Sequence, residues 1–228
     1  MKKIALVFSA AVLLNAAAGA QDLKSKRGEN FLPEKGDWSI GFNADGIFEY
    51  IGNAFNGTTD NVAPSLNFQQ LGTFVGKRFT ANNKADRYMA NLGVLSNKVG
   101  DNTESGFDLT VGYGKEWRRG KTRLQGFYGA DAMLNVNSNS TKEVAGAVTT
   151  TVKSGLNFGI GARGFIGAEY FIFPKISMGA QYSYGLMVDV GGKSTTSVTG
   201  QPDVTGAAST GINLGLNDAF SINVNLHF

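Results

Sequence analysis

The C-terminal stretch from Phe220 to Phe228 constrains the fold of this chain more than any other part of it. Large apolar side chains stand at every second position, at Phe220, Ile222, Val224, Leu226 and Phe228, with polar residues between them. Successive side chains of a β-strand point to opposite faces, so all the apolar groups share one face. The pattern therefore predicts a terminal strand with one apolar face. It leaves open whether that face meets a protein core or lipid.

The N-terminus predicts a cleaved secretory signal peptide over residues 1–20. Lys2 and Lys3 precede an apolar run from Ile4 to Leu14, and the small residues 18–20 provide a cleavage site. This run is too short to cross a bilayer as a helix, which argues against a membrane anchor. The chain has no cysteine, which excludes a lipoprotein anchor, a disulfide framework and thiol chemistry.

Composition points to one domain made of strands. Loss of Lys2 and Lys3 with the signal lowers the formal charge from +3 to +1, which gives no reason to expect nucleic acid as a partner. Glycine is abundant, with 31 residues, and proline is scarce, with 4. No helical period occurs beyond the signal, so many strands joined by polar turns are expected. Residues 21–36 are charged and aperiodic and are interpreted as a periplasmic tether, and residues 37–228 as one β domain.

Period-two alternation predicts seven further strands. They cover residues 38–45, 66–79, 87–94, 107–116, 123–134, 156–170 and 176–184. A slip of phase near Gln69 and Gln70 indicates a β-bulge in the second of them. Long polar loops are expected at 52–64, 97–105, 137–153 and 190–218, and they alternate with short turns. All long loops then lie at one end of the structure and both termini at the other, as in an up-and-down antiparallel barrel.

The direction of the apolar face separates two alternatives. In a soluble lipocalin-like barrel it points inward, and in an outer-membrane barrel it meets lipid. The polar faces are rich in Gly, Ser, Asn and Gln rather than in charge, and an export signal occurs without disulfides, which favours lipid. Aromatic residues also fall at one level near the short turns, as an interfacial girdle requires: Trp38, Tyr88, Trp117, Tyr170 and Phe228. We therefore predict an all-β, eight-stranded antiparallel transmembrane β-barrel.

The signal, the alternation of long and short connections and the closing pattern resemble the small OmpA/OmpX-type outer-membrane β-barrel domains of Gram-negative bacteria. The resemblance implies a location in the outer membrane, with membrane lipids as partners. It also implies that the closing strand, with Phe220, Ile222, Val224, Leu226 and Phe228, is the signal read by the barrel assembly machinery.

The interior of such a barrel is predicted to hold a network of charged residues: Asp108, Glu116, Arg123, Asp131 and Arg163, with Arg87 and Glu169 near the short turns. A two-residue turn at Arg119 and Gly120 would place Glu116 opposite Arg123 as an ion pair. The same register would place Asp108 opposite Asp131, and two adjacent buried carboxylates need a cation. Arg163 on the neighbouring strand is the expected partner.

The network could act as a gate or proton path, but we favour the interpretation that it fills a narrow lumen, because an eight-stranded barrel has room for little else. No catalytic or metal site is expected. His227 is the only histidine, and Ser221, on the same strand face, would lie roughly 20 Å away at the usual strand rise. The Gly159–Gly164 stretch matches a dinucleotide fingerprint in letters but lies inside an alternating strand with no helix after it.

The sequence therefore predicts a non-enzymatic outer-membrane barrel without a cofactor, whose lumen is plugged and whose long loops serve a structural or surface-interaction role. An extracellular ligand of these loops is expected but not identified by their composition. The main alternative is a narrow, porin-like pore for ions or small solutes. A lipid-modifying enzyme and a soluble carrier are the remaining alternatives.

Overall fold

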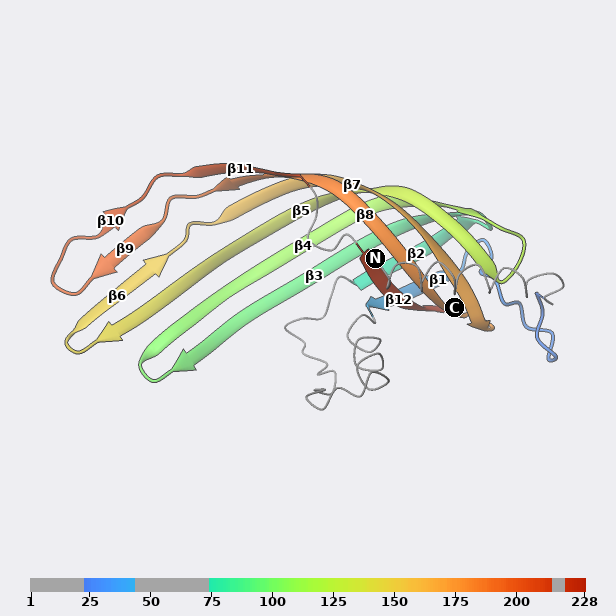
Figure 1. Ribbon diagram of the computed structural model, residues 1–228, viewed down its shortest axis with the longest axis horizontal. Coiled ribbons are helices and arrows are strands. Elements are labelled where there is room, and N and C mark those ends of the chain that lie inside the picture. Colours follow the sequence, from blue (N-terminus) through green and yellow to red (C-terminus); the bar gives the residue numbers. More distant parts are fainter. Residues whose placement is uncertain (1–22, 44–73, 215–219) are drawn as a thin grey trace, which may run out of the picture.

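The computed structural model describes residues 23–43, 74–214 and 220–228 of the chain. Within these ranges the fold is one antiparallel sheet of twelve strands (Figure 1). The strands are β1 (Trp38–Asn43), β2 (Phe74–Ala81), β3 (Lys84–Val99), β4 (Asn102–Arg119), β5 (Leu124–Ala145), β6 (Val148–Lys153), β7 (Asn157–Phe173), β8 (Ile176–Gly191), β9 (Thr195–Val198), β10 (Val204–Thr205), β11 (Ser209–Leu214) and β12 (Phe220–His227). Nowhere in this part of the chain is there a helix long and apolar enough to cross a membrane.

Eight of the twelve strands pair in a closed ring. β1 to β5 pair in order, β5 pairs with β7, β7 with β8, β8 with β12, and β12 returns to β1. The first and last strands are joined by reciprocal backbone hydrogen bonds between Trp38 and Phe228, of 2.7 and 2.9 Å. The ring therefore leaves no unpaired strand edge at this junction.

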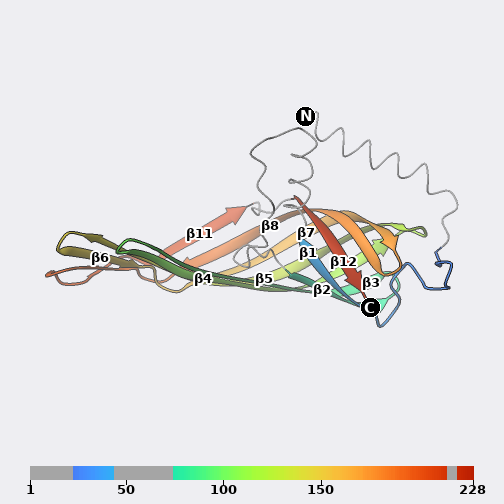
Figure 2. The same ribbon diagram turned by 90° about the horizontal axis from the view of Figure 1, so that it is seen from below.

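The other four strands extend the sheet beyond the ring. β6 pairs with the distal part of β5, β9 with β6, β10 with β9, and β11 with the distal part of β8. Figure 2 shows this extension projecting to one side of the strands β1, β2 and β12. The prediction of eight strands therefore omitted the strands that continue past the ring.

Three stretches predicted as long loops are largely strand. Residues 97–105 form a hairpin between β3 and β4 with Gly100 at φ 62°, and residues 137–153 form one between β5 and β6 with Gly146 at φ 61°. Residues 190–218 contain β9, β10 and β11 within their described part. These segments are rich in Ser, Thr and Asn, and apart from Ile212 and Leu214 in β11 they carry little of the alternation on which the prediction depended. Their β-branched threonines nevertheless suit an extended ladder.

Several expectations lie outside the described residues: the signal peptide over 1–20, the loop at 52–64 and the bulge near Gln69 and Gln70. The observed part of the second strand has its irregularity elsewhere, between Phe79 and Ala81.

The segment predicted as a tether packs against the short turns, with the Phe31 side chain 5% exposed. The Gly36 amide donates to the Phe79 carbonyl oxygen at 2.8 Å, which fixes this segment beside β2.

Most large aliphatic side chains of the ring strands are exposed, whereas several of the charged ones are buried. Leu109 of β4 is 39% exposed and Ile160 of β7 is 63% exposed, whereas Glu116, on the opposite face of β4 from Leu109, is 0% exposed. This distribution is the reverse of that in a soluble barrel. The predicted orientation of the apolar faces, away from the centre of the ring, is confirmed.

Aromatic side chains inside the ring lie over glycines on the neighbouring strand. Phe165 of β7 is opposite Gly129 of β5, and Phe127 of β5 is opposite Gly167 of β7. Both phenylalanines are 5% exposed, and their ring centroids are 6.3 Å apart. Each glycine provides the space that a ring occupies, which explains part of the glycine content of the interior face.

We predict that Gly129→Ala destabilises the fold by about 1–3 kcal/mol, the usual cost of overpacking. A Cβ at this position would collide with the Lys115 carbonyl oxygen and the Phe165 ring. Denaturant titration measures the free energy of unfolding. Gly211→Ala in β11 is the matched control, since its Cβ would meet nothing within 4 Å. Equal losses for the two variants would contradict the packing argument.

Candidate functional site

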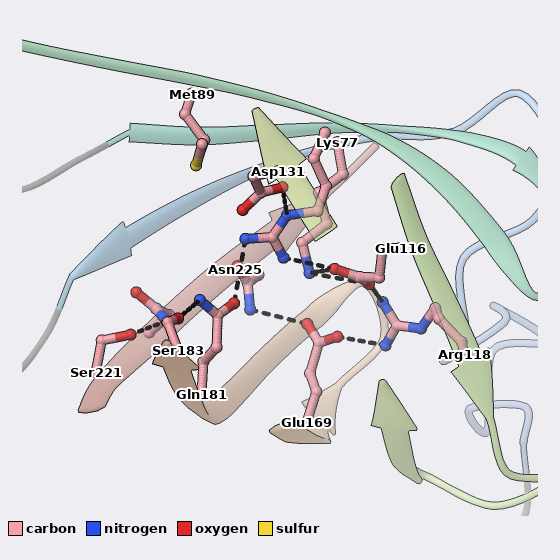
Figure 3. Close-up of polar contacts among 12 residues, drawn as sticks. Lys77, Met89, Glu116, Arg118, Asp131, Glu169, Gln181, Ser183, Ser221 and Asn225 are labelled. Atoms are coloured by element: carbon pink, nitrogen blue, oxygen red, sulfur yellow. Dashed lines mark hydrogen bonds and ion pairs between the residues drawn. The ribbon is translucent and has the colours of Figure 1, made fainter. Parts of the chain in front are cut away.

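A buried network of ion pairs crosses the interior of the ring near the short turns (Figure 3). Its charged members face inward from four neighbouring strands of the ring: Lys77 of β2, Arg87 of β3, Glu116 and Arg118 of β4, and Asp131 of β5, joined by Arg163 and Glu169 of β7. Each occupies an interior position because strand alternation places the neighbouring apolar residues outside.

Glu116 is the centre of this network. Its carboxylate is 3.0 Å from Lys77 Nζ, 2.8 Å from Arg87 Nη1 and 3.2 Å from Arg118 Nη1. The side chain is fully buried, and burying an unpaired carboxylate would cost several kcal/mol. Three cations on three adjacent strands therefore share this anion, which ties β2, β3 and β4 together from the inside.

The network continues on both sides of Glu116. Arg87 Nε also lies 3.3 Å from Asp131 Oδ1, and the other oxygen of Asp131 accepts a hydrogen bond from Arg163 Nε at 2.9 Å. On the other side, Arg118 forms an ion pair with Glu169. A continuous series of charged contacts thus runs from Arg163 to Glu169 across the interior.

Aromatic rings cover the cations of the network. Lys77 Nζ is 5.0 Å from the centroid of the Phe127 ring, and the Arg87 guanidinium is 3.9 Å from that of Phe165. Arg118 lies near two further rings, Phe79 at 5.4 Å and Phe171 at 5.7 Å. Cation–π contacts stabilise charge where water is excluded, so the rings and the ion pairs together fill this cross-section.

Glu169 also joins a polar cluster that resembles a catalytic triad in composition. Its Oε1 lies 2.8 Å from Asn225 Nδ2 and 3.2 Å from His227 Nε2, and it accepts a hydrogen bond from the Ser177 hydroxyl. The same His227 nitrogen faces Ser177 Oγ at 3.1 Å. A triad needs the acid and the nucleophile on different imidazole nitrogens. Here both share Nε2, and all of these side chains are buried.

Two of the predicted cross-strand pairs are wrong. Glu116 lies opposite Gly129 instead of Arg123, and Asp108 lies opposite Asn137 instead of Asp131. The connection between β4 and β5 is longer than a two-residue turn, so Arg119 pairs with Gly126. This shift is an even number of residues, which keeps every side chain on its predicted face but changes its partner.

The structure brings together Glu116, Asp131 and Arg163 of the predicted network and separates the other two residues. Asp108 lies farther along the interior and accepts a hydrogen bond from Asn135 Nδ2 at 3.0 Å. The Arg123 guanidinium lies 3.6 Å from the ring centroid of Phe31 in the N-terminal segment.

The sequence prediction missed Lys77 and Arg118 as members of the network. Arg118 lies two residues after Glu116 and therefore on the same face of the strand. The predicted fourth strand ended at residue 116, so Arg118 was not assigned to the interior. Lys77 lies in the second predicted strand, where the slip of phase near Gln69 and Gln70 interrupts the alternation. The sequence signal that could have found Arg118 was its position two residues after an interior acid, because such residues share one face of a strand.

Of the aromatic residues predicted at the short-turn level, Trp38 neighbours both Tyr88 and Phe228, while Trp117 and Tyr170 contact other residues. Trp38 stacks on Tyr88 with ring centroids 6.2 Å apart, and Trp117 stacks on Tyr128 at 5.9 Å. Phe228 pairs with Trp38 at the ring junction, and Tyr170 pairs with Leu124 and Met178. Of the closing residues, Phe220, Leu226 and Phe228 are exposed, whereas Ile222 and Val224 are half-buried.

A cavity of about 300 Å³ lies where the N-terminal segment meets the short turns, with Arg118 and Gln125 in its wall. Its other lining residues come from both parts: Leu23, Asn30, Leu32, Pro33, Glu34, Asn82, Asn83 and Gly120. In the described ranges no three His, Asp or Glu side chains gather in a way that could hold a metal ion.

Comparison with known proteins gives a structural likeness. No protein-family model matches the chain, and no curated protein matches it in sequence. Among solved structures, the chain is similar to the crystal structure of a major outer membrane protein from Thermus thermophilus. The TM-score is 0.40 at 9% sequence identity, and the match covers 84% of this chain and 98% of that chain.

We predict that Glu116→Gln destabilises the protein by about 3–5 kcal/mol, because the substitution leaves three buried cations without their shared anion. The free energy of unfolding is measured by denaturant titration. Asp86→Asn is the control, since it removes the anion of a surface pair in which the Lys115 side chain is 58% exposed and that of Asp86 19%, and it should cost about 1 kcal/mol or less. A loss for Glu116→Gln no larger than for the control would contradict the central role of Glu116.

A second prediction concerns pH. Burial opposes ionisation of Asp37, but hydrogen bonds from Lys175 and from the Glu34 amide outweigh it and lower the pKa of Asp37 below its ordinary value of 3.8. A lowered pKa stabilises the fold above the unfolded-state value, and that stability is lost as pH falls through the folded-state value. The stability difference between wild type and Asp37→Asn should therefore be constant near neutral pH and shrink below about pH 4. A difference that grows on acidification would contradict this assignment.

Proposed function

We propose that this protein is an integral outer-membrane β-barrel protein, with the eight paired strands as its membrane-spanning wall. The single observation that carries the proposal is the reversed exposure of the ring, apolar outside and charged inside. A soluble protein rarely leaves so extensive an apolar surface to water. In a bilayer the same surface is solvated by acyl chains, and a closed ring satisfies the backbone groups of its wall by strand pairing.

The height of the apolar surface supports this assignment. On β4, the outward side chains from Phe107 to Trp117 are apolar or aromatic except for Lys115 near the short-turn end. They span ten residue steps, or about 34 Å along the strand. At a strand tilt of about 40° this corresponds to about 26 Å, close to the thickness of the apolar band of outer-membrane barrels. Trp38, Tyr88 and Trp117 would then lie at the interface on the short-turn side.

In this proposal the lumen is plugged and the protein is not an enzyme. The ion pairs around Glu116 and the rings of Phe79, Phe127, Phe165 and Phe171 occupy the interior near the short turns. The role is structural or surface-directed, through the long hairpins on the opposite side, with an extracellular ligand as partner. The closing strand β12 would be recognised by the barrel assembly machinery during insertion.

Reconstitution tests the membrane assignment. The mature chain refolded into lipid vesicles is expected to resist extraction by carbonate and to migrate faster on a detergent gel before heating than after. An unheated sample that migrates like the heated one and partitions to the aqueous phase would contradict the proposal and support the soluble-carrier alternative.

Conductance across a planar bilayer separates the plugged barrel from the pore alternative. We expect no stable unitary current from the inserted wild-type protein, because the buried network closes the interior. A stepwise current that changes size in Arg163→Ala would contradict the plug and support a narrow pore. Insertion is verified on the same preparation by its heat-dependent mobility.

A further inference from the structure

The strands that extend beyond the ring form a sheet whose charges are sorted by face. This hairpin sheet consists of residues 95–99 of β3, 102–106 of β4 and 137–145 of β5, together with β6 and β9. It is the part of Figure 1 that projects away from β1, β2 and β12. Its pairings run without any register shift, so the face of each side chain follows from its position in the ladder.

All of its strand-borne lysines lie on the outward face, the face that is continuous with the apolar surface of the ring. They are Lys98, Lys142 and Lys153, and each is exposed. Its two strand-borne acids, Glu104 and Glu143, lie on the opposite face. None of the three lysines forms an ion pair with another residue in the described part of the chain.

The lysines stand a short distance beyond the last apolar row of the outer wall, where Val94 pairs with Phe107. Lys153 lies in the row two residues farther along, and Lys98 and Lys142 in the row four residues farther. These offsets correspond to roughly 5 and 10 Å of height at a strand tilt of about 40°. The polar headgroups of a bilayer begin at this depth outside the hydrocarbon.

Hydroxyl groups fill the positions between the lysines. Thr103 lies between Lys98 and Lys142 in one row, and Ser140 lies beside Lys153 in the other. Lys98 and Lys142 are two strands apart, about 10 Å. Like charges at this spacing, with no acid on their face, are stabilised by an anion between them. Ammonium and hydroxyl donors together suit phosphate oxygens.

We propose that the outward face of the hairpin sheet binds the phosphate-bearing headgroups of lipids in the leaflet on the long-hairpin side. The inference rests on the proposed membrane-spanning role of the ring. Continuity with the apolar surface selects a lipid as the source of the phosphate, because its acyl chains would lie against Val94 and Phe107 while its headgroup meets the lysines.

Spin-labelled lipids test this proposal on the full mature chain in phosphatidylcholine bilayers. Electron paramagnetic resonance measures how much of a labelled phosphatidic acid, or of a labelled phosphatidylcholine, is motionally restricted by the protein. At low salt we expect wild type to prefer the anionic lipid by at least about threefold, as a few weak surface charge contacts allow. The triple variant Lys98→Gln, Lys142→Gln, Lys153→Gln is expected to lose most of this preference. The control Glu104→Gln, Glu143→Gln should keep it.

Three results would overturn the proposal: equal restriction of both lipids by wild type, an undiminished preference in the triple lysine variant, or a preference abolished by inorganic phosphate at constant ionic strength. The last would indicate a site for free phosphate. Failure of the underlying membrane assignment is distinguishable, since neither labelled lipid would then show a restricted component.

Discussion

Pairing of β1 with β12 is the constraint on which the remaining structure depends. These strands stand at opposite ends of the β domain, and their ladder runs from Ser39 opposite His227 to Asn43 opposite Asn223. Without it the sheet would expose two free edges, which pair readily with other chains. Once the ring is closed, alternation along every strand assigns each side chain to a narrow interior or to the outside.

Inside the closed ring, the buried charges stabilise one another as ion pairs. Its charged groups would each be costly to bury alone, yet Glu116 and Asp131 satisfy the arginines and lysine that face them. Phe127 and Phe165 fit there because Gly167 and Gly129 lie opposite them. The interior near the short turns therefore requires particular charged residues and glycines at particular positions, whereas the outer surface requires only apolar side chains.

The sequence predicted correctly which face of a strand each side chain occupies, because this depends only on alternation. It failed to predict which residues lie opposite one another, because this depends on the lengths of the connections between strands. Alternation around Leu109 and Ile160 gave the right face for each of these ring strands. The partner of Glu116 was wrong because the length of the connection after Arg119 cannot be read from its composition. Hairpins such as that at Gly146 were missed because strands polar on both faces have no period to detect. Clustering of Lys77 and Arg118 with Glu116 depends on several strands at once, which single-strand patterns do not encode.

The orientation of the apolar face is the central claim, and the absence of cysteine from the chain makes it directly measurable. A fluorophore on a single cysteine introduced at Leu109 or Ile160 reports its surroundings in the reconstituted protein. Both labels should be quenched by brominated acyl chains and remain insensitive to aqueous iodide. Quenching of both by iodide, without any effect of brominated lipid, would contradict the account.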